Sequence, residues 1–365
     1  MRLRPLASFV LALAACAGPS APSPARSSAQ PAAATPAPKP PGTDLALPGE
    51  RHLRNVHQLT FGGENAEGYF SFDGRQIVFQ STQRGAGCDQ LYVMNADGTG
   101  PHRVSNGEGR VTCGYFFPDG SRILYSSTFA TGPACPPPPD RSHGYVWPLD
   151  DFTIYTALPD GSDPRPLVPA PGSYTAEATI SRDGWIVFTS TRDGDLELYK
   201  MHLDGSNLAR LTHEEGYDGG AFFSPDGKRI VYRAARAGTD EERATARVLL
   251  AKKLVRPGKL EIWVMEADGS NKRQVTQLGA ASFAPFFHPD GKRIVFASNH
   301  GDPKGRNFDL FIVNDDGTGL ERVTTNDTFD GFPMFSPDGK KLVFASNRND
   351  ERPGETNLFI ADWVE

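Results

Sequence analysis

Four acidic residues recur along the chain and could act together if the fold brings them to one place. They are Glu67, Glu177, Asp218 and Asp330. Converging carboxylates can bind a divalent cation or the basic end of a peptide. The alternative is that each acid pairs with a nearby arginine, such as Arg192 or Arg348, and that these ion pairs only join neighbouring structural units.

Aromatic residues accompany these acids. Tyr217, Phe283 and Phe332 stand in the same segments, and Tyr145 and Trp147 belong to a proline-rich stretch that reads ACPPPPDRSHGYVWP. Aromatic side chains beside charges are typical of protein and peptide binding sites. We therefore expect Tyr217, Trp147 and Phe332 to join the four acids in one binding site.

The sequence shows no clear catalytic apparatus. It has no Gly-x-Ser-x-Gly motif, and its eight His residues lack metal-binding spacing. The formal net charge of −6 provides no basic footprint, so nucleic acid is not an expected partner. We expect no cofactor, unless the four acids hold a divalent cation.

The elements that must position these residues are six copies of one repeat. Each copy has an aromatic segment, an Asp-Gly pair and an apolar run, as in FFSPDGKRIVYRA from Phe222. Asp-Gly between two extended segments is a strong signal for a two-residue β-hairpin turn. The aspartates of these six turns are Asp73, Asp119, Asp183, Asp226, Asp290 and Asp338.

A second Asp-Gly turn follows later in five of the copies, at Asp97, Asp160, Asp204, Asp268 and Asp316. A unit of about 45 residues with two hairpins is typical of one β-propeller blade. The predicted fold class is therefore all-β, a six-bladed propeller in a single domain.

The last copy ends at LFIADWVE, one strand short of a complete blade. The segment HLRNVHQLT, residues 52–60, ends in Leu-Thr like the fourth strands and has no blade of its own. We expect this N-terminal strand to close the last blade, which removes exposed sheet edges. The propeller is expected to span residues 51–365.

Repeats of the form F-S-P-D-G-K-x-I-V-F-x-S, followed by L-Y-V-M-N-x-D-G, resemble the propeller of the TolB family over residues 51–365. The resemblance implies a six-bladed propeller in the cell envelope. Arg182 and Phe72 depart from the pattern, because they replace the Pro before the third and first turns. The additional N-terminal α/β domain of TolB is not expected, since residues 17–50 contain too few large apolar side chains to fold into one.

Two long insertions fall between the second and third strands of the second and fourth blades. In propellers such loops share one face with the loops that join successive blades, so we expect both insertions on the face that holds the acids. The first spans about residues 131–151. The second, about residues 239–257, has the apolar spacing of a helix. We predict that this helix packs as a lid, and the alternative is an exposed helix that binds a partner.

Three cysteines, Cys88, Cys113 and Cys135, are expected on that same face. In an oxidising compartment we expect one disulfide and one remaining thiol. Pairing of Cys113 with Cys135 would attach the first insertion to its own blade, whereas pairing of Cys88 with Cys113 would join the first two blades. The first pairing is preferred.

The N-terminal residues have the pattern of a lipoprotein signal peptide, residues 1–15. An apolar run from Leu6 to Ala15 is too short to span a bilayer, and Leu13-Ala14-Ala15-Cys16 resembles the bacterial lipobox. The resemblance implies lipidation of Cys16. Residues 16–50 would then form a lipidated, disordered Ala/Pro/Ser-rich linker. Because Ala17 is not an Asp, resemblance to lipoprotein sorting favours the periplasmic side of the outer membrane.

Together these features predict a monomeric, lipid-anchored envelope propeller without enzymatic activity. Its insertion-bearing face would bind an envelope protein, peptide or glycan, and only the lipid anchor would contact the membrane. The alternative is a metal-dependent hydrolase or lyase with a cation at the channel mouth. A fold of this class alone does not decide between them.

Overall fold

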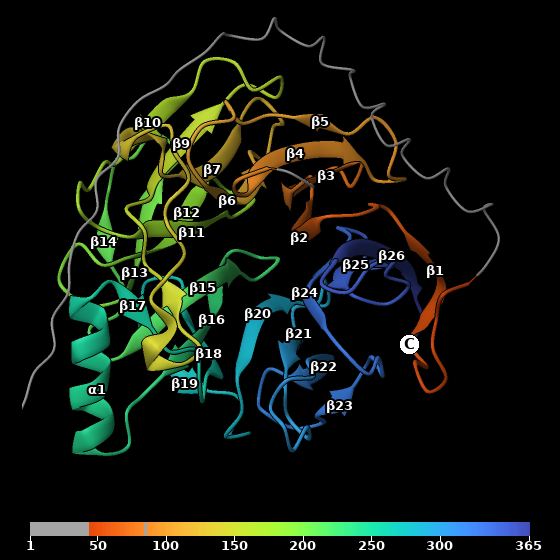
Figure 1. Cartoon of the computed structure of the whole chain (residues 1–365). Coiled ribbons are helices and arrows are strands. Elements are labelled where there is room, and N and C mark those ends of the chain that lie inside the picture. Colours follow the sequence, from red (N-terminus) through yellow and green to blue (C-terminus); the bar gives the residue numbers. More distant parts are fainter. Residues whose placement is uncertain (1–43, 84–85) are drawn as a thin grey trace, which may run out of the picture. The chain divides into compact units, whose positions relative to one another are not determined.

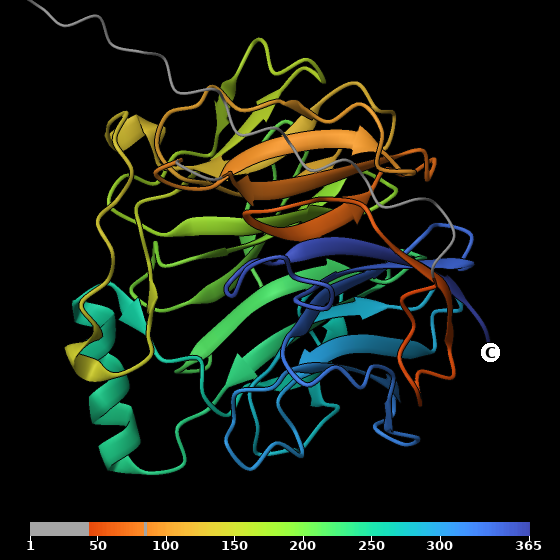
Figure 2. The same ribbon diagram turned by 45° about the vertical axis from the view of Figure 1, so that its right-hand side comes forward.

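The computed structural model describes residues 44–83 and 86–365, which form a ring of six antiparallel sheets (Figures 1 and 2). Each sheet is a blade of four strands, and the first strand of each repeat lies on the inner side of the ring. The predicted six-bladed β-propeller is therefore confirmed. Among the described residues, no helix has the length and apolar character needed to cross a membrane.

The first three blades follow one another along the chain. Blade one consists of β2 (Glu64–Phe70), β3 (Gln76–Thr82), β4 (Gln90–Asn95) and β5 (His102–Arg103). Blade two consists of β6 (Val111–Phe116), β7 (Ile123–Ser127), β9 (Thr153–Ala157) and β10 (Arg165–Leu167). Blade three consists of β11 (Thr175–Ile180), β12 (Trp185–Ser190), β13 (Glu197–His202) and β14 (Ala209–Arg210).

The remaining three blades complete the ring. Blade four consists of β15 (Tyr217–Phe223), β16 (Arg229–Ala235), β18 (Glu261–Glu266) and β19 (Arg273–Gln274). Blade five consists of β20 (Ser282–Phe287), β21 (Arg293–Ser298), β22 (Asp309–Asn314) and β23 (Glu321–Arg322). Blade six consists of β24 (Asp330–Phe335), β25 (Lys341–Ser346), β26 (Asn357–Trp363) and β1 (Leu53–Gln58).

The N-terminal strand closes the ring, as predicted. Strand β1 pairs antiparallel with β26, with Leu53 opposite Trp363 and Gln58 opposite Phe359. Leu53 and Val56 are fully buried in the core of blades five and six. The last blade is therefore built from both ends of the propeller, and β1 covers the edge that β26 would otherwise expose.

The ordered propeller begins a few residues before the expected start at residue 51. Asp44 accepts hydrogen bonds from the backbone N–H groups of Asn55 and Val56, at 2.9 and 2.8 Å. The buried Glu50 carboxylate binds the guanidinium of Arg348 at 2.8 Å. The predicted signal peptide, the lipidation site Cys16 and most of the predicted linker lie outside the described residues.

The Asp-Gly turns have the structural role expected for them. Most of the turn aspartates accept the backbone N–H two residues further on, as Asp119 does from Ser121 at 2.9 Å. Glycine is required at some of these turns for space as well as conformation. Gly161 has φ 84°, and a Cβ added there would lie 2.6 Å from the carbonyl oxygen of Val104.

The two insertions lie on one face, as expected, and they contact each other, which was not predicted from the sequence. The first contains the 3-10 turns η1 (Phe129–Thr131) and η2 (Arg141–His143) and the strand β8 (Trp147–Pro148). The second contains α1 (Asp240–Ala251) and β17 (Leu254–Val255). Strands β8 and β17 pair antiparallel, so the insertion of blade two crosses blade three to reach that of blade four.

Helix α1 is not the packed lid that its spacing suggested. It begins with a capping box, in which the Thr239 hydroxyl accepts from the Glu242 N–H at 3.1 Å and the Glu242 carboxylate accepts from the Thr239 N–H at 3.2 Å. Leu249 is its only buried residue. The helix therefore stands at the edge of the ring beside β17 (Figure 1) and leaves most of its surface exposed.

The disulfide joins Cys88 to Cys135, with Cα atoms 5.8 Å apart, so both pairings expected from the sequence are wrong. It links the β3–β4 loop of blade one to the insertion of blade two. Cys113 is the remaining free thiol, because it lies in the inner strand β6 and not in a loop of the face. One disulfide and one thiol were expected, but the path of the insertion decides which residues meet.

We predict that replacing Leu53 by Ala lowers the free energy of unfolding by about 2 to 5 kcal/mol, because the missing atoms leave a cavity beside Trp363. The measurement is urea-induced unfolding followed by tryptophan fluorescence. Leu208→Ala removes the same atoms from a side chain that is 42% exposed and should change stability by less than about 0.5 kcal/mol. Equal effects of the two variants would show that β1 does not close the ring.

Candidate functional site

Each inner strand of the propeller contains one β-bulge, and the bulges determine which side chains line the central channel. The first bulged residue of each strand has a positive φ between 49° and 58°, although only one of the six is glycine. Bulges redirect side chains and leave backbone groups unpaired. The six residues, in blade order, are Glu67, Cys113, Glu177, Gly220, Ala284 and Phe332.

These six residues surround one small cavity, which we call the channel cavity. Its volume is about 30 Å³, enough for one or two water molecules but not for a peptide. Below it the channel is filled by an aromatic plug, formed by Tyr69, Tyr115, Phe222 and Phe286 with ring centroids 5.4 to 6.2 Å apart. The structure therefore has two separate channel mouths and no open passage.

Two of the predicted acids, Glu67 and Glu177, belong to this ring and have the same structural role. The Glu67 carboxylate accepts the N–H of Cys113 in the next blade at 3.1 Å. The Glu177 carboxylate accepts the N–H of Gly220 in its next blade at 2.9 Å. Each acid thus satisfies a backbone donor that the neighbouring bulge leaves unpaired, and in doing so joins adjacent blades.

Glu177 is also the acid of a buried ion pair. Its second carboxylate oxygen binds the Arg233 guanidinium, which also donates to the Tyr217 hydroxyl from Nε at 3.0 Å. Thr189 donates to the carboxylate at 2.7 Å. Removing one partner of such a pair leaves an uncompensated buried charge, which typically costs about 3 to 5 kcal/mol.

Trp147 covers this network from the insertion side. The Arg233 guanidinium carbon lies 5.4 Å from the centroid of the Trp147 ring and 5.3 Å from that of Tyr217. Trp147 also meets Phe283 edge to face at 6.5 Å, and Phe283 meets Phe332 at 5.4 Å. The predicted residues Glu67, Glu177, Tyr217, Trp147 and Phe332 are therefore close neighbours around one mouth of the channel.

The two remaining acids, Asp218 and Asp330, do not join this ring. Each stands two residues before the bulge of its strand, and neither lines the channel cavity. Asp218 pairs with Arg236 at 2.6 Å. Asp330 pairs with Arg348 at 3.1 Å, and Arg348 also holds Glu50. The expected convergence of four carboxylates is therefore wrong.

The predicted arginine partners are right in one case and wrong in the other. Arg348 does bind Asp330, as the alternative reading proposed. Arg192 instead lies over the rings of Phe188 and Tyr199, at 5.2 and 5.1 Å. Glu177 takes Arg233 from the neighbouring blade, a residue that sequence reasoning missed. The available signal was Arg233, the second Arg of the segment RIVYRA, which follows the apolar residues Ile-Val-Tyr.

Burial changes the protonation of the channel carboxylates and thiol. Burial, with the repulsion of Glu177 added, raises the pKa of Glu67 to about 7, against the hydrogen bond from Cys113, which lowers it. Burial raises the pKa of the Cys113 thiol well above its ordinary value, and the charges of Glu67 and Glu177 raise it further. The thiol is therefore held neutral and is a poor nucleophile.

A metal ion finds no ligand set here. Among residues 44–83 and 86–365, no group of three or more His, Cys, Asp or Glu side chains is placed to hold one. The Asp218 carboxylate, which the metal hypothesis required, is engaged by Arg236, although burial outweighs this ion pair and raises the pKa of Asp218 to about 7. The alternative of a metal-dependent hydrolase or lyase thus gains no support from the site.

A larger cleft opens next to this mouth, between α1 and the loops of blades three and four. This helix cleft has a volume of about 600 Å³. Its apolar lining includes Leu196, Leu250 and Val255. Ion pairs between Glu215 and Arg247, at 2.6 Å, and between Glu242 and Lys259, at 2.9 Å, flank it. Its inner wall contains Tyr217 and Arg236, so it adjoins the network around Glu177.

We predict that stability depends on pH through Glu67. Its pKa is about 7 in the folded chain and near 4.5 when unfolded, so the folded chain binds the proton more tightly and loses stability as pH rises through this window. Glu67→Gln should remove that loss. Its free energy of unfolding should therefore rise relative to wild type between pH 5 and pH 8, as measured by urea titration.

The matched control for this experiment is Glu64→Gln, which removes an exposed acid from the same strand. Its stability should follow that of the wild type across the pH range. If Glu67→Gln also runs parallel to wild type, then Glu67 is not held in a protonated, buried state by the channel.

No family model matches the chain. Among curated relatives, an uncharacterized protein of Agrobacterium fabrum is 26% identical over 155 residues, covering 41% of this chain and 44% of its own length. A TolB homolog of Chlorobium luteolum is 30% identical over 148 residues, covering 34% of each protein. The chain thus matches less than half the length of either relative.

Solved structures share the fold over most of the chain. TolB from Acinetobacter baumannii has a TM-score of 0.53 and 19% identity, covering 83% of this chain and 64% of its own. A structure assigned to TolB from Agrobacterium tumefaciens has a TM-score of 0.54 and 20% identity, covering 83% and 91%. A gluconolactonase from Xanthomonas campestris has a TM-score of 0.58 and 13% identity, covering 89% and 99%.

The gluconolactonase likeness concerns the fold alone, because propellers serve catalytic and non-catalytic proteins alike. The TolB likeness is supported by sequence as well, through the matching repeats. With six blades, Asp-Gly turns and this similarity, the chain is a TolB-like β-propeller.

Proposed function

We propose that this protein is a lipid-anchored module of the bacterial envelope that binds a protein or peptide partner on its insertion-bearing face. The TolB-like propeller and the similarity to a TolB homolog support a binding role in the envelope. The segment Leu13-Ala14-Ala15-Cys16, which resembles the lipobox, supports anchoring through Cys16. The Pro-rich linker would let the propeller reach a partner away from the membrane surface.

The helix cleft is the observation that carries this proposal. Its volume of about 600 Å³ lies within the range of ligand-binding pockets, about 300 to 1,000 Å³. Leu250 and Val255 supply apolar surface against which a large side chain of a partner can be buried. An anchor of this kind, surrounded by polar groups, is the usual centre of a protein interface.

The ion pairs beside the cleft suit exchange with a charged partner. The side chains of Arg247 and Glu215 are 70% and 48% exposed, and such solvent-screened surface pairs contribute little to stability. The charged side chains of a partner can therefore replace these ion pairs with little loss of stabilising free energy. Complementary charges would then set the orientation of the partner and the rate of association.

The residues around the channel mouth support the cleft and do not form a second pocket. Glu177, Arg233 and Tyr217 already satisfy one another, and the channel cavity has room only for water. Trp147 and the pairing of β8 with β17 hold the two insertions together. Their role in the proposal is to fix the inner wall of the helix cleft.

We predict that a photo-crosslinking residue at Ala246, which lines the helix cleft, forms one discrete adduct with an envelope protein. The full-length chain is expressed in its source bacterium with benzoylphenylalanine at this position, irradiated and analysed by immunoblotting and mass spectrometry. The adduct should be lost when Leu250→Arg is added, because an arginine there fills and charges the apolar wall.

Val248 provides the matched control for crosslinking. It is on the same helix and 54% exposed, but it does not line the cleft. The same probe at Val248 should yield no discrete adduct. Identical adducts from both positions, or none from Ala246, would contradict partner binding in the helix cleft.

We predict that Cys16→Ser moves the full-length protein from the membrane fraction to the soluble fraction, because a protein without its lipid has no remaining anchor. Cell fractionation with immunoblotting measures this change. Cys113→Ser is the matched control, since Cys113 lies inside the propeller, and it should remain with membranes. Membrane retention of Cys16→Ser would contradict the lipid anchor but not the binding face.

A further inference from the structure

The opposite mouth of the channel, on the side of the first Asp-Gly turns, differs from the insertion-bearing mouth in its chemistry. On this side the repeat places one residue per blade immediately before the turn aspartate, and all of them except Pro118 line the mouth. Five of the six are apolar and one is a cation. In blade order they are Phe72, Pro118, Arg182, Pro225, Pro289 and Pro337.

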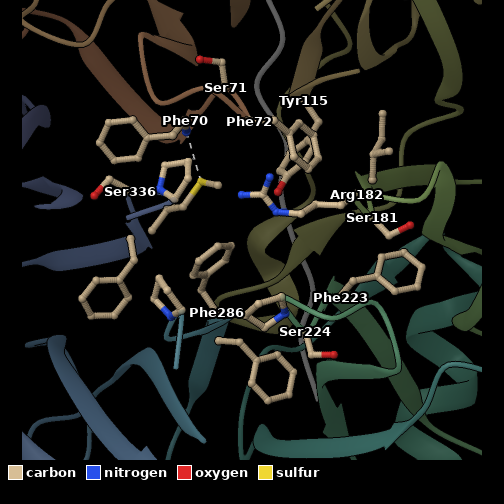
Figure 3. A pocket seen from close by; sticks show the side chains of 17 residues that line it. Phe70, Ser71, Phe72, Tyr115, Ser181, Arg182, Phe223, Ser224, Phe286 and Ser336 are labelled. Atoms are coloured by element: carbon tan, nitrogen blue, oxygen red, sulfur yellow. Dashed lines mark hydrogen bonds between the residues drawn. The ribbon is translucent and has the colours of Figure 1, made fainter. Parts of the chain in front are cut away.

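This mouth is a concave, largely aromatic cavity of about 80 Å³, which we call the turn-side cavity. Its inner end is closed by Tyr115 and Phe286 of the aromatic plug. Its lining also includes Phe70, Phe72 and Phe223, and Figure 3 shows these rings arranged around its centre. A cavity of this size accepts part of a small organic molecule or one side-chain-sized group.

Among the described residues, Arg182 is the only charged side chain that lines the turn-side cavity. Its guanidinium reaches toward the middle of the surrounding rings in Figure 3, and its carbon lies 5.5 Å from the centroid of Phe72. Within residues 44–83 and 86–365, no carboxylate is within ion-pair distance of it. The cation is therefore available to an anion from outside the chain.

Three turn aspartates from other blades accept hydrogen bonds within their own turns. Asp226 accepts from the hydroxyl of Ser224 at 2.6 Å, and Asp338 accepts from that of Ser336 at 2.6 Å. Asp73 does the same with Ser71. These three carboxylates are thus held in their own hairpins and do not line the cavity, where the described residues place Arg182 among mostly apolar side chains.

A guanidinium beside aromatic rings selects a particular kind of ligand. The planar fork of Arg binds a carboxylate through two parallel hydrogen bonds. The rings and prolines favour an apolar body attached to that carboxylate. We propose that the turn-side cavity binds a small organic carboxylate with an aromatic or apolar body, its carboxylate on Arg182 and its body against Phe72 and Phe286.

This site is independent of the helix cleft, because it lies at the other mouth of a channel that the aromatic plug closes. Phe72 and Arg182 are also the two positions where the repeat departs from Pro before its turn. The departures are neighbours in space, since the Arg182 guanidinium lies over the Phe72 ring. Two substitutions in the repeat therefore combine into one feature of the cavity.

Isothermal titration of the purified propeller with 3-phenylpropionate tests the proposal. Two probes separate the parts of the ligand: 3-phenylpropionamide keeps the ring without the charge, and acetate keeps the carboxylate without the ring. We expect 3-phenylpropionate to bind at least about tenfold more tightly than either probe. The affinity should fall as salt is added, because the cation lies at a solvent-facing mouth.

Arg182→Pro is the decisive variant, because it restores the residue that four other turns carry at this position. It should weaken 3-phenylpropionate binding at least about tenfold and leave the amide unaffected. Arg182→Gln, which keeps the turn backbone unchanged, gives the same comparison if the proline variant folds poorly. Arg75→Gln removes an exposed cation outside the cavity and should bind like wild type.

The proposal fails if wild type binds none of the three probes, or if the amide binds as tightly as the carboxylate. It also fails if acetate matches 3-phenylpropionate, because the aromatic surface would then contribute nothing. Equal binding by wild type and the Arg182 variants would place any carboxylate site elsewhere. None of these results bears on the helix cleft, which has its own test.

Discussion

The pairing of β1 with β26 holds the propeller closed, and the position of every residue around the channel depends on it. Blades of a propeller contact mainly their neighbours, so only a closed ring fixes the first blade against the last. Here that contact is reinforced from the same N-terminal segment. Glu50 inserts its carboxylate beside Asp330, and Arg348 binds both. A buried triad of this kind is costly to break, so it ties the chain start to the face that carries the insertions.

The second constraint is the bulge in each inner strand. A bulge leaves one N–H unpaired and turns its side chain toward the axis. In blades two and four that N–H is satisfied by Glu67 and Glu177 of the preceding blades. These acids therefore act across blade boundaries, and together with the aromatic plug they leave only a small cavity inside the channel.

The repeat, the turns and the closing strand could be predicted because each has a recurring sequence pattern. The register of the inner strands could not be predicted from the sequence, because a bulge shifts the alternation of inward and outward side chains by one residue. Asp218 and Asp330 therefore looked equivalent to Glu67 although neither lines the channel cavity. The pairing of Cys88 with Cys135 was hidden for another reason. It depends on the path of an irregular insertion, and this path has no repeating sequence pattern from which it could be predicted.

The two ends of the channel differ in the size of their cavities and in the charges around them, although the same repeat builds both. At the insertion-bearing end, added segments bring charges of both signs and apolar side chains around a wide cleft. At the other end the turns between the first and second strands are short. There Arg182 stands where four other turns have Pro, and it adds a positive charge to the mostly apolar turn-side cavity. The aromatic plug between them is close-packed, so a ligand at one end can affect the other only by moving those rings. Two separate binding surfaces on one rigid ring are thus the arrangement that this packing favours.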